Sequence, residues 1–416
     1  MKVVLVGVLW TSCQRALADA PADWTLMAYL SGDGDLEAAA VGYVRMLESV
    51  GSSERVNVAV QLDRCEGGDA TRPDFADARR MLIDRRRQDS DGIVSTTAEE
   101  LGEVDMASAA TLGAFVRWTR ERCPGRRYGL IVMGHGSGLV DLPHPFVRLP
   151  SQVCGVCHDE TSGTRMSAAD LGAALRSFVR DTGEPLIDVL FLDACLTGLL
   201  EVVYELRGAC RYVTASEYVM LTPGAPWDQI LAGLVAWPDM SPREFAANYV
   251  WQAAGYWAQV PDVAVTHAAI DVAQATVLAR RLGRLSEELT DTIAESAPPV
   301  TYARAVSRSF GPNRQYVDLG QFARALARTH PRKAVRRLAR EVAEGVTSAV
   351  VTEYHSGPAE SRDQEPTGLS VFFPPNLSEL PDAYMASASL ARETQWGQFL
   401  QTYLRHVRRL FDREAA

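Results

Sequence analysis

The sequence predicts an α/β fold in which helices sandwich a mainly parallel central sheet, followed by a mostly helical C-terminal region. Near-continuous apolar runs over residues 128–133 and 186–192 are typical of strands that are buried on both faces of a parallel sheet. Helical patterns separate the apolar runs in the first half of the chain. Amphipathic helical patterns dominate from Pro242 onward.

The individual elements follow from the spacing of apolar residues. The predicted strands lie at 24–30, 56–62, 128–133 and 186–192, with a short hairpin formed by 80–85 and 92–96 and a strand end at 213–215. The predicted helices lie at 36–50, 112–122, 245–258, 273–293 and 334–351, and one more begins near Ser167, where Asp170 completes a capping arrangement. A last strand pattern, 369–373, is expected to return to the main body.

Composition and charge narrow the class of protein. The 416 residues are 47% apolar and 23% charged, which excludes disordered, collagen-like and disulfide-scaffold proteins. The formal charge is −10, and the longest basic run is 85–87, so binding to nucleic acid through phosphates is not expected. No stretch reaches the length of about 18 apolar residues that a membrane-spanning helix needs.

The N-terminus has the three parts of a secretory signal. Lys2 precedes a short apolar core at 3–10, and an A-x-A pattern ends at Ala18. We therefore expect residues 1–20 to direct secretion or export to the periplasm, with cleavage after Ala18, and the alternative is a buried first strand. A lipid anchor on Cys13 is disfavoured because Trp10 stands where a small aliphatic residue is expected.

The seven cysteines are an odd number for an exported chain, so at least one stays free or pairs between chains. Removal of the signal would leave six, which could all pair, but a chain of this length does not need a disulfide framework. A free thiol with a chemical role is therefore worth seeking.

Reactive side chains follow two of the predicted strands. The 128–133 run leads into Gly134-His135-Gly136, and the 186–192 run leads into Asp193-Ala194-Cys195. Reactive groups of α/β sheets gather beyond the carboxyl ends of the strands, so a thiol nucleophile and its acid/base partner could face each other here. Backbone N–H groups near Gly136 and Cys195 could stabilise an oxyanion. Taken singly, each residue also fits a structural role, as a buried thiol or a hydrogen-bonded histidine.

The chain resembles the clostripain family of cysteine peptidases, which has the caspase-like fold, from Trp24 to about Tyr403. The similar segments are 24–30 with 34–37, 100–106, 134–138, 193–195, 216–217, 317–319, 368–374 and 396–400. The resemblance implies a caspase-like three-layer sandwich over 21–235 and a mostly helical region over 236–416.

The resemblance assigns roles to four residues. His135 would be the catalytic histidine and Cys195 the nucleophile, while Asp193 would select an Arg or Lys side chain before the cut bond. The alternative for Asp193 is a strand-end residue that caps the next helix. Glu217 would belong to the same acidic pocket, although the sequence does not decide this.

Activation in this family commonly proceeds by self-cleavage between the two catalytic residues. The long loop at 139–163 lies there, and Arg148 is the basic residue placed most like a processing site, with Arg165 as the rival. The alternative is a surface loop that is not processed.

Cofactors are not expected. Cys154, Cys157 and His158 form a C-x-x-C-H pattern, for which haem attachment, a local disulfide and two inert thiols are the alternatives. No metal site is predicted, because Asp33-Gly34-Asp35 is too short for a calcium loop, although some family members depend on calcium. The predicted protein is thus a secreted cysteine endopeptidase whose partners are peptides with Arg or Lys before the cut, and the alternative is a catalytically silent binding protein on the same fold.

Overall fold

A computed structural model describes residues 21–86, 92–136, 138–139, 155–357, 365–375, 380 and 382–414. The predicted secretory signal at 1–20, the predicted processing site Arg148 and the thiol of Cys154 lie outside these residues.

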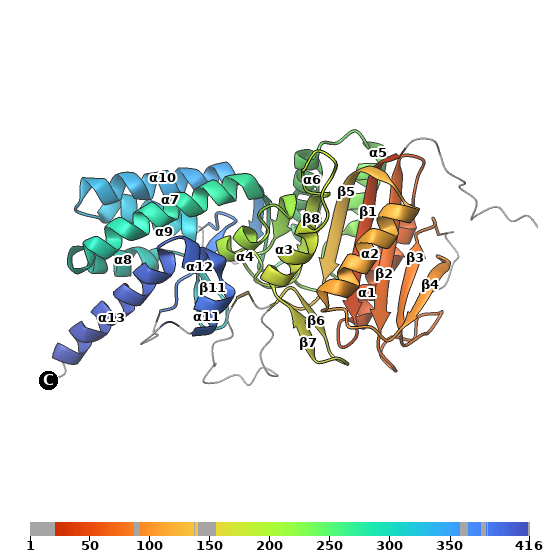
Figure 1. The fold of residues 1–416 in the computed structure, drawn as a ribbon, viewed down its shortest axis with the longest axis horizontal. Coiled ribbons are helices and arrows are strands. Elements are labelled where there is room, and N and C mark those ends of the chain that lie inside the picture. The colour runs from red at the N-terminus through yellow and green to blue at the C-terminus, as the bar shows by residue number, and fades with distance from the viewer. Residues whose placement is uncertain are drawn as a thin grey trace, which may run out of the picture.

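A nine-stranded sheet forms the centre of the molecule, in the order β13-β10-β9-β8-β5-β1-β2-β3-β4 (Figure 1). The five central strands, β9, β8, β5, β1 and β2, are parallel, and the strands on both sides of them are antiparallel. The strands span β1 Ala22–Gly32, β2 Val56–Arg64, β3 Ala78–Leu82, β4 Thr97–Gly102, β5 Gly125–Met133, β8 Ile187–Asp193, β9 Cys210–Ala215, β10 Val265–Asp271 and β13 Val350–Ser356.

The middle parts of β5 and β8 are apolar because both faces of the sheet are covered there. In β5, Leu130 and Val132 point into one buried apolar cluster, whereas Ile131 and Met133 point into another. The same alternation holds in β8, where Leu190 and Leu192 oppose Val189 and Phe191. This period of two is the geometry of a strand, and two cores on opposite faces make the predicted three-layer sandwich.

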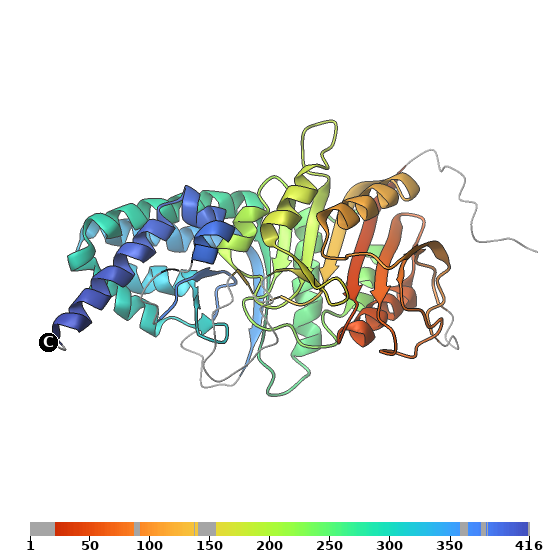
Figure 2. The ribbon, with the colours of Figure 1, turned by 60° about the horizontal axis from the view of Figure 1, so that its bottom comes forward.

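Helices from different parts of the chain cover the two faces. One face carries α2 Ala109–Arg122, α3 Ala168–Arg176 and α4 Leu200–Glu205, and the other carries α1 Glu37–Val50, α5 Trp227–Ala236 and α6 Pro242–Trp257. Figure 2 shows α2 and α3 along one side of the sheet and α1 on the opposite side. The predicted capping box at the start of α3 is present, since Ser167 and Asp170 exchange side chain and backbone hydrogen bonds.

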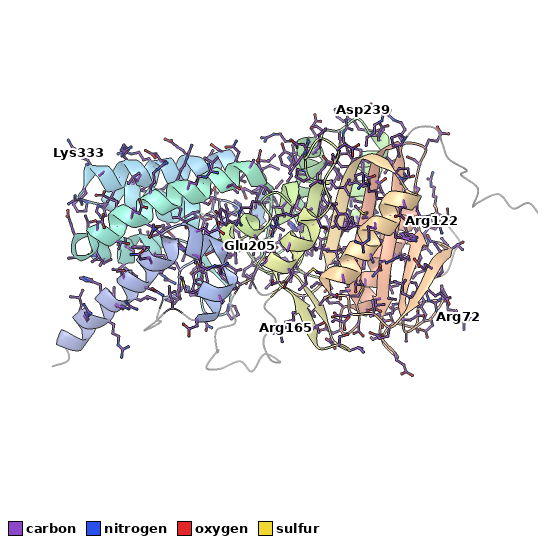
Figure 3. The ribbon with its side chains drawn as sticks, viewed as in Figure 1. Arg72, Arg122, Arg165, Glu205, Asp239 and Lys333 are labelled. Atoms are coloured by element: carbon purple, nitrogen blue, oxygen red, sulfur yellow. The ribbon has the colours of Figure 1, made fainter. Side chains whose placement is uncertain are left out.

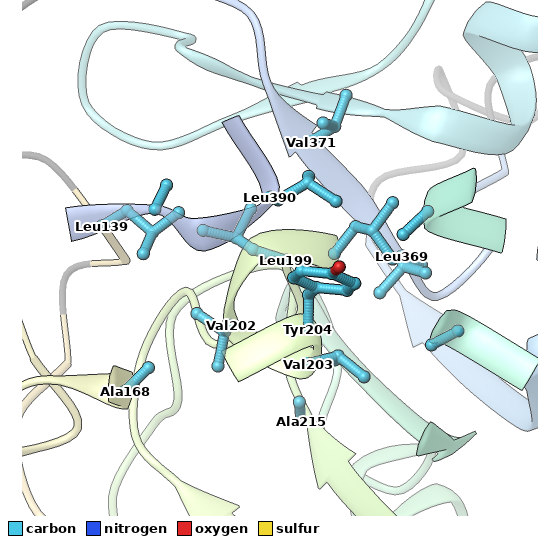
Figure 4. Close-up of a cluster of buried hydrophobic side chains, with 14 of the residues drawn as sticks. Leu139, Ala168, Leu199, Val202, Val203, Tyr204, Ala215, Leu369, Val371 and Leu390 are labelled. Atoms are coloured by element: carbon cyan, nitrogen blue, oxygen red, sulfur yellow. The ribbon is translucent and has the colours of Figure 1, made fainter. Parts of the chain in front are cut away.

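The C-terminal half forms a helical lobe that is continuous with the sheet. Its long helices are α7 Val272–Asp291, α8 Ile293–Val306, α9 Leu319–Thr329, α10 Lys333–Ala349 and α13 Trp396–Glu414, and its short ones are α11 Asp382–Ser387 and α12 Ser389–Glu393. One apolar cluster runs from the α2 face of the sheet into this lobe, and Figure 4 shows Leu199 and Val203 meeting Leu369, Val371 and Leu390 there.

Residue 235 is not a border of the sheet. The strands β10 and β13 and the covering helix α6 all come from the region beyond it. The hairpin at the opposite edge pairs β3 with β4, so its second strand starts at Thr97, later than the predicted 92–96. The predicted return of 369–373 is made by β14 Ser370–Phe372, which joins β11 Ser309–Phe310 and β12 Tyr316–Asp318 in a three-stranded sheet.

Among the residues that the structure describes, no helix combines the length and the apolar character needed to cross a membrane.

Candidate active site

The predicted pair, His135 and Cys195, follows two neighbouring strands at the same rim of the sheet. Strands β5 and β8 pair in parallel up to Met133 and Asp193, so each member of the pair lies two residues beyond the same register position. The N–H of Gly134 donates to the carbonyl of Asp193 at 3.4 Å, which extends the pairing past the strand end. The topology therefore brings together two residues that are 60 positions apart in the chain.

The two strand-end loops touch each other at Gly136. A Cβ atom at this position would lie 2.9 Å from the backbone nitrogen of Cys195 and closer still to its carbonyl oxygen. Real Cβ atoms do not approach backbone atoms that closely, so only glycine fits here. The loop that carries the histidine is consequently packed directly on the backbone of the cysteine.

The imidazole of His135 is bound to a carboxylate that the sequence did not single out as a site residue. Its Nε2 lies 2.6 Å from Oδ1 of Asp35, and the side chains of His135 and Asp35 are 38% and 73% exposed. An ionised carboxylate can only accept, so Nε2 carries the proton and Nδ1 is the nitrogen left for proton transfer. The signal available in the sequence was the position of Asp35 just after β1, which neighbours β5 in the sheet.

The thiol of Cys195 is held on a strained turn. Leu196 has a φ of 58°, a left-handed conformation that is costly for a leucine and that often marks functional sites. The turn is fixed by the N–H of Leu196, which donates to Tyr218 at 3.0 Å, and by the N–H of Gly198, which donates to Ser216 at 2.7 Å. The Cys195 sulfur accepts from the Met220 N–H at 3.2 Å, and burial raises the pKa of the thiol. A proton acceptor is therefore needed to generate the thiolate.

The carboxylate of Asp193 is 5% exposed and points to the face of the sheet covered by α1, α5 and α6. It accepts hydrogen bonds from the Tyr43 hydroxyl at 3.0 Å, the Trp227 indole at 2.8 Å and the Tyr249 hydroxyl at 2.6 Å. Burial raises the pKa of Asp193, and the three donors act in the opposite direction. All three are neutral groups, so this carboxylate is solvated by the protein but not neutralised by it.

Glu217 is buried two residues beyond the end of β9. Its carboxylate accepts from the Gly368 N–H at 3.0 Å and from the Ser370 hydroxyl, so it ties the end of β9 to the segment before β14. Burial first, and the Asp318 carboxylate second, raise the pKa of Glu217. These contacts give Glu217 a structural task, and its oxygens are not directed at the donors that surround Asp193.

The residues near the predicted processing loop are only partly described. Arg165, the rival processing site, lies on β7 Thr164–Met166 and is labelled in Figure 3. This strand pairs with β6 Cys157–Asp159. Cys157 is a free thiol without solvent exposure, and burial raises its pKa to about 12. Such a thiol is not accessible for attachment of a haem group.

Comparisons with known proteins point to one family. A family model described as the clostripain family matches residues 28–403. Clostripain from Hathewaya histolytica is 24% identical over 222 residues, which are 50% of this chain and 41% of that protein. The chain thus matches about two fifths of the length of this curated relative.

Two solved structures share the fold. A secreted C11 cysteine protease from Bacteroides thetaiotaomicron, solved in complex with an irreversible peptide inhibitor, superposes with a TM-score of 0.63 at 17% identity, covering 92% of this chain and 99% of that one. An inactive zymogen of a C11 protease from Parabacteroides distasonis gives a TM-score of 0.62 at 18% identity, with the same coverage. At these identities the likeness shows a shared fold.

Proposed function

The chain belongs to the clostripain family, and from this premise we propose that it is a cysteine endopeptidase in which Cys195 is the nucleophile and His135 the acid/base. The observation that carries the proposal is the contact of Gly136 with the Cys195 backbone, because it joins the two strand-end loops at one rim of the sheet.

The chemistry follows from the protonation states. His135 takes the proton of the Cys195 thiol, and the sulfur attacks the carbonyl carbon of the cut bond. The tetrahedral oxyanion forms beside the backbone N–H groups of Gly136 and Cys195. The histidine then gives its proton to the leaving amine, and water hydrolyses the thioester with His135 as base, which restores the thiol.

We assign substrate selection to Asp193. An ionised carboxylate offers about four acceptor positions, and three donors occupy three of them. A basic side chain of the substrate would supply the opposite charge that this buried group lacks, and a guanidinium also matches the planar geometry of a carboxylate. This supports a preference for Arg, and also for Lys, before the cut bond.

The activity is tested with a panel of fluorogenic peptides that differ only in the residue before the cut. We expect cleavage after Arg and Lys by the wild-type chain and none by Cys195→Ala. Cys65→Ala is the matched control, since Cys65 is the other partly exposed thiol among the described residues. A folded wild-type chain that binds these peptides without cleaving them would instead support the catalytically silent alternative.

The specificity is tested by Asp193→Asn, which keeps the size of the side chain and removes the charge. Loss of one partner of a buried charged contact costs about 2–5 kcal/mol, so kcat/KM for Arg peptides should fall about 30-fold or more. Cleavage after Ala should fall much less. An equal loss for Arg and Ala peptides would mean that Asp193 only supports the fold, and a thermal melt shows whether the variant is folded.

We further propose activation by self-cleavage after Arg148, within the loop between the two catalytic residues. The Arg148→Ala chain should remain uncut on a denaturing gel, whereas Arg165→Ala should yield the same two fragments as wild type. Identical fragments from Arg148→Ala would contradict this assignment. Cys195→Ala separates self-cleavage from a contaminating protease.

We also propose that the chain is exported, to the periplasm or beyond. The support is the secretory pattern of residues 1–20 together with the description of the Bacteroides thetaiotaomicron relative as secreted. The N-terminal sequence of the mature protein tests this, and a start at Asp19 would agree with cleavage after Ala18.

A further inference from the structure

An open groove lies between two helices of the C-terminal lobe, α9 and α10. Its volume is about 530 Å³. Four arginines line it, two from each helix: Arg324 and Arg328 of α9, and Arg336 and Arg340 of α10. Ala327 and Ala343, which pack on the apolar core, line it as well. Figure 3 labels Lys333 at the start of α10, next to the turn that joins the two helices. We call this feature the arginine groove.

The groove arginines differ from a neighbouring arginine in their lack of acidic partners. Arg337 of α10, which does not line the groove, pairs with Glu341 at 2.9 Å. Within the part of the chain that the structure describes, none of the four groove arginines forms an ion pair with an acidic side chain. Burial raises the pKa of Asp318 to about 6, and the charge of Arg324 opposes this shift from beyond ion-pair distance. The positive charge of the groove is therefore not neutralised by the fold.

This arrangement is unfavourable for a helix pair that binds nothing. Arg324 and Arg328 are four residues apart on α9, as are Arg336 and Arg340 on α10, and like charges at this spacing destabilise a helix. Glu344, the acidic residue of the groove, follows Arg340 by one turn but does not pair with it. The chain as a whole has a formal charge of −10. Positive charge gathered in a groove of an acidic protein favours an anionic partner.

Arg336 is oriented by the turn that joins the helices. Its Nη1 donates to the carbonyls of His330 at 2.8 Å and Pro331 at 2.6 Å. A guanidinium has five N–H donors, so Nε and Nη2 still offer three of them to a ligand. The planar fork that they form matches the two oxygens of a carboxylate. The end of the groove beside the turn thus presents a pre-oriented donor group.

We propose that the arginine groove binds an acidic segment of another polypeptide in an extended conformation. An α-helix rises 1.5 Å per residue, so the two arginines of each helix are about 6 Å apart along its axis. Side chains on one face of an extended peptide repeat every second residue, at about 6.6 Å. Asp or Glu at alternate positions would therefore place carboxylates in step with the arginines.

The spacing favours a peptide over other anions. Successive groups of a condensed phosphate share an oxygen atom, so they are closer together than the arginines of one helix. A membrane surface is broad and does not follow a groove between two helices. The groove shares no residue with the candidate active site, so binding there does not rest on the proposed peptidase activity.

Fluorescence anisotropy tests the binding on the full-length Cys195→Ala chain, which excludes cleavage of the probe. The probe is a fluorescein-labelled peptide of about ten residues in which Glu alternates with Ser, and the control peptide has Gln in place of Glu. We expect saturable binding of one Glu peptide per chain with a Kd below about 1 mM in about 20 mM NaCl. Because most of the groove arginines are exposed, about 200 mM NaCl should weaken it about 10-fold. No binding of the Glu peptide, or equal binding of the Gln peptide, would overturn the proposal.

Four variants in the same background locate the site. Arg340→Glu should weaken binding about 10-fold or more, because it replaces an attraction by a repulsion, and Arg328→Gln should weaken it about 3-fold. Glu344→Gln should tighten binding, since it removes the negative charge from the groove. Arg337→Gln is the matched control: it removes an exposed arginine of α10 outside the groove and should bind as the parent does. Unchanged binding by Arg340→Glu, or an equal loss in Arg337→Gln, would contradict the assignment, and thermal melts show that each variant is folded.

Competition separates a peptide from a phosphate ligand. The unlabelled Glu peptide should displace the probe at a lower concentration than inorganic tripolyphosphate does. Displacement by tripolyphosphate at an equal or lower concentration would assign the groove to phosphate groups and overturn the assignment to an acidic peptide.

Discussion

At the scale of single residues, the contact of His135 with Asp35 decides which nitrogen of the imidazole can move protons. In the proposed mechanism, a carboxylate on Nε2 leaves Nδ1 for the thiol and the leaving amine, and its negative charge favours the imidazolium that forms when His135 takes the proton of Cys195. Asp35 is largely exposed, so this contact operates close to solvent. Salt should therefore screen part of its effect.

Asp35→Ala tests this role. Hydrogen bonds to charged groups contribute about 1.5–3 kcal/mol, and exposure places this one near the lower end, so kcat should fall about 10-fold while KM changes little. The difference from wild type should shrink as the NaCl concentration rises. A fall in kcat that does not depend on salt, or a rise in KM alone, would contradict a role through the charge of Asp35.

At the scale of elements, the site depends on two parallel strands that end in register. The pairing of Met133 with Asp193 makes both loops begin at the same level along the strand direction. Gly136 allows the loop that carries His135 to lie on the Cys195 backbone. The left-handed Leu196 then turns the chain immediately after the cysteine. The geometry of the proposed dyad is therefore a property of strand register and of one glycine.

Gly136→Ala should separate the two loops. The added methyl would overlap the Cys195 backbone, and a displacement of about 1 Å in a catalytic group can cost about 100-fold in rate, so kcat/KM should fall by that order. Gly255→Ala is the matched control, because nothing lies within 4 Å of a Cβ at that helical position, and it should leave activity unchanged and stabilise the chain by up to about 1 kcal/mol. Full activity of Gly136→Ala would show that the loops need not touch.

At the scale of the whole molecule, buried glutamates join the sandwich to the C-terminal segments. Glu201 of α4 accepts from the Phe372 N–H at 3.0 Å and the Tyr384 hydroxyl at 2.9 Å. Glu217 binds the segment before β14 in the same manner. Together with the continuous apolar cluster, these contacts make the helical lobe and the sandwich one folded unit.

The Glu201 contact predicts a dependence of stability on pH. Burial raises its pKa from 4.5 to about 7, so the folded chain binds this proton more tightly than the unfolded chain between these values. The contribution of Glu201 is most favourable below pH 4.5 and is lost as the pH rises through 7. The ionised form therefore destabilises the fold by on the order of 3 kcal/mol at pH 8.

Glu201→Gln should remove this dependence. In the Cys195→Ala background, urea unfolding should find the variant more stable than its parent at pH 8 and no more stable near pH 5. The glutamine oxygen can still accept from Phe372 and Tyr384, so the contact itself is kept. An equal difference between variant and parent at both pH values would show that Glu201 does not carry the effect.

The sequence predicts the sandwich well because its signals are local. The apolar runs of β5 and β8 and the helical spacing of α2, α7 and α10 lie within single elements, and the structure confirms them with small shifts of their ends. The strand β4 lacks such a signal, since Glu99 and Glu100 face solvent at the sheet edge. The predicted start of this strand was therefore wrong. The strands β10 and β13 were missed as members of the central sheet because pairing between distant segments leaves no periodic trace.

The difference between local signals and contacts between distant segments also explains which parts of the site could be predicted. The placement of His135 and Cys195 followed from two buried strands that end near each other in a parallel sheet. The contact of His135 with Asp35 could not be predicted, because Asp35 follows β1, and the position of β1 beside β5 depends on the complete topology of the sheet. Glu217 accepts a hydrogen bond from Ser370, which is more than 150 residues further along the chain. Its separation from Asp193 could therefore not be predicted either.

The most direct measurement of the central claim is the mass of the intact chain after exposure to a peptidyl-arginine acyloxymethyl ketone. The account predicts a single adduct on Cys195 of the wild-type chain, slower labelling of His135→Ala, and no adduct on the partly exposed Cys65. Labelling of Cys65 in place of Cys195, or labelling of Cys195 at the same rate with and without His135, would contradict a paired thiol and imidazole at this rim of the sheet.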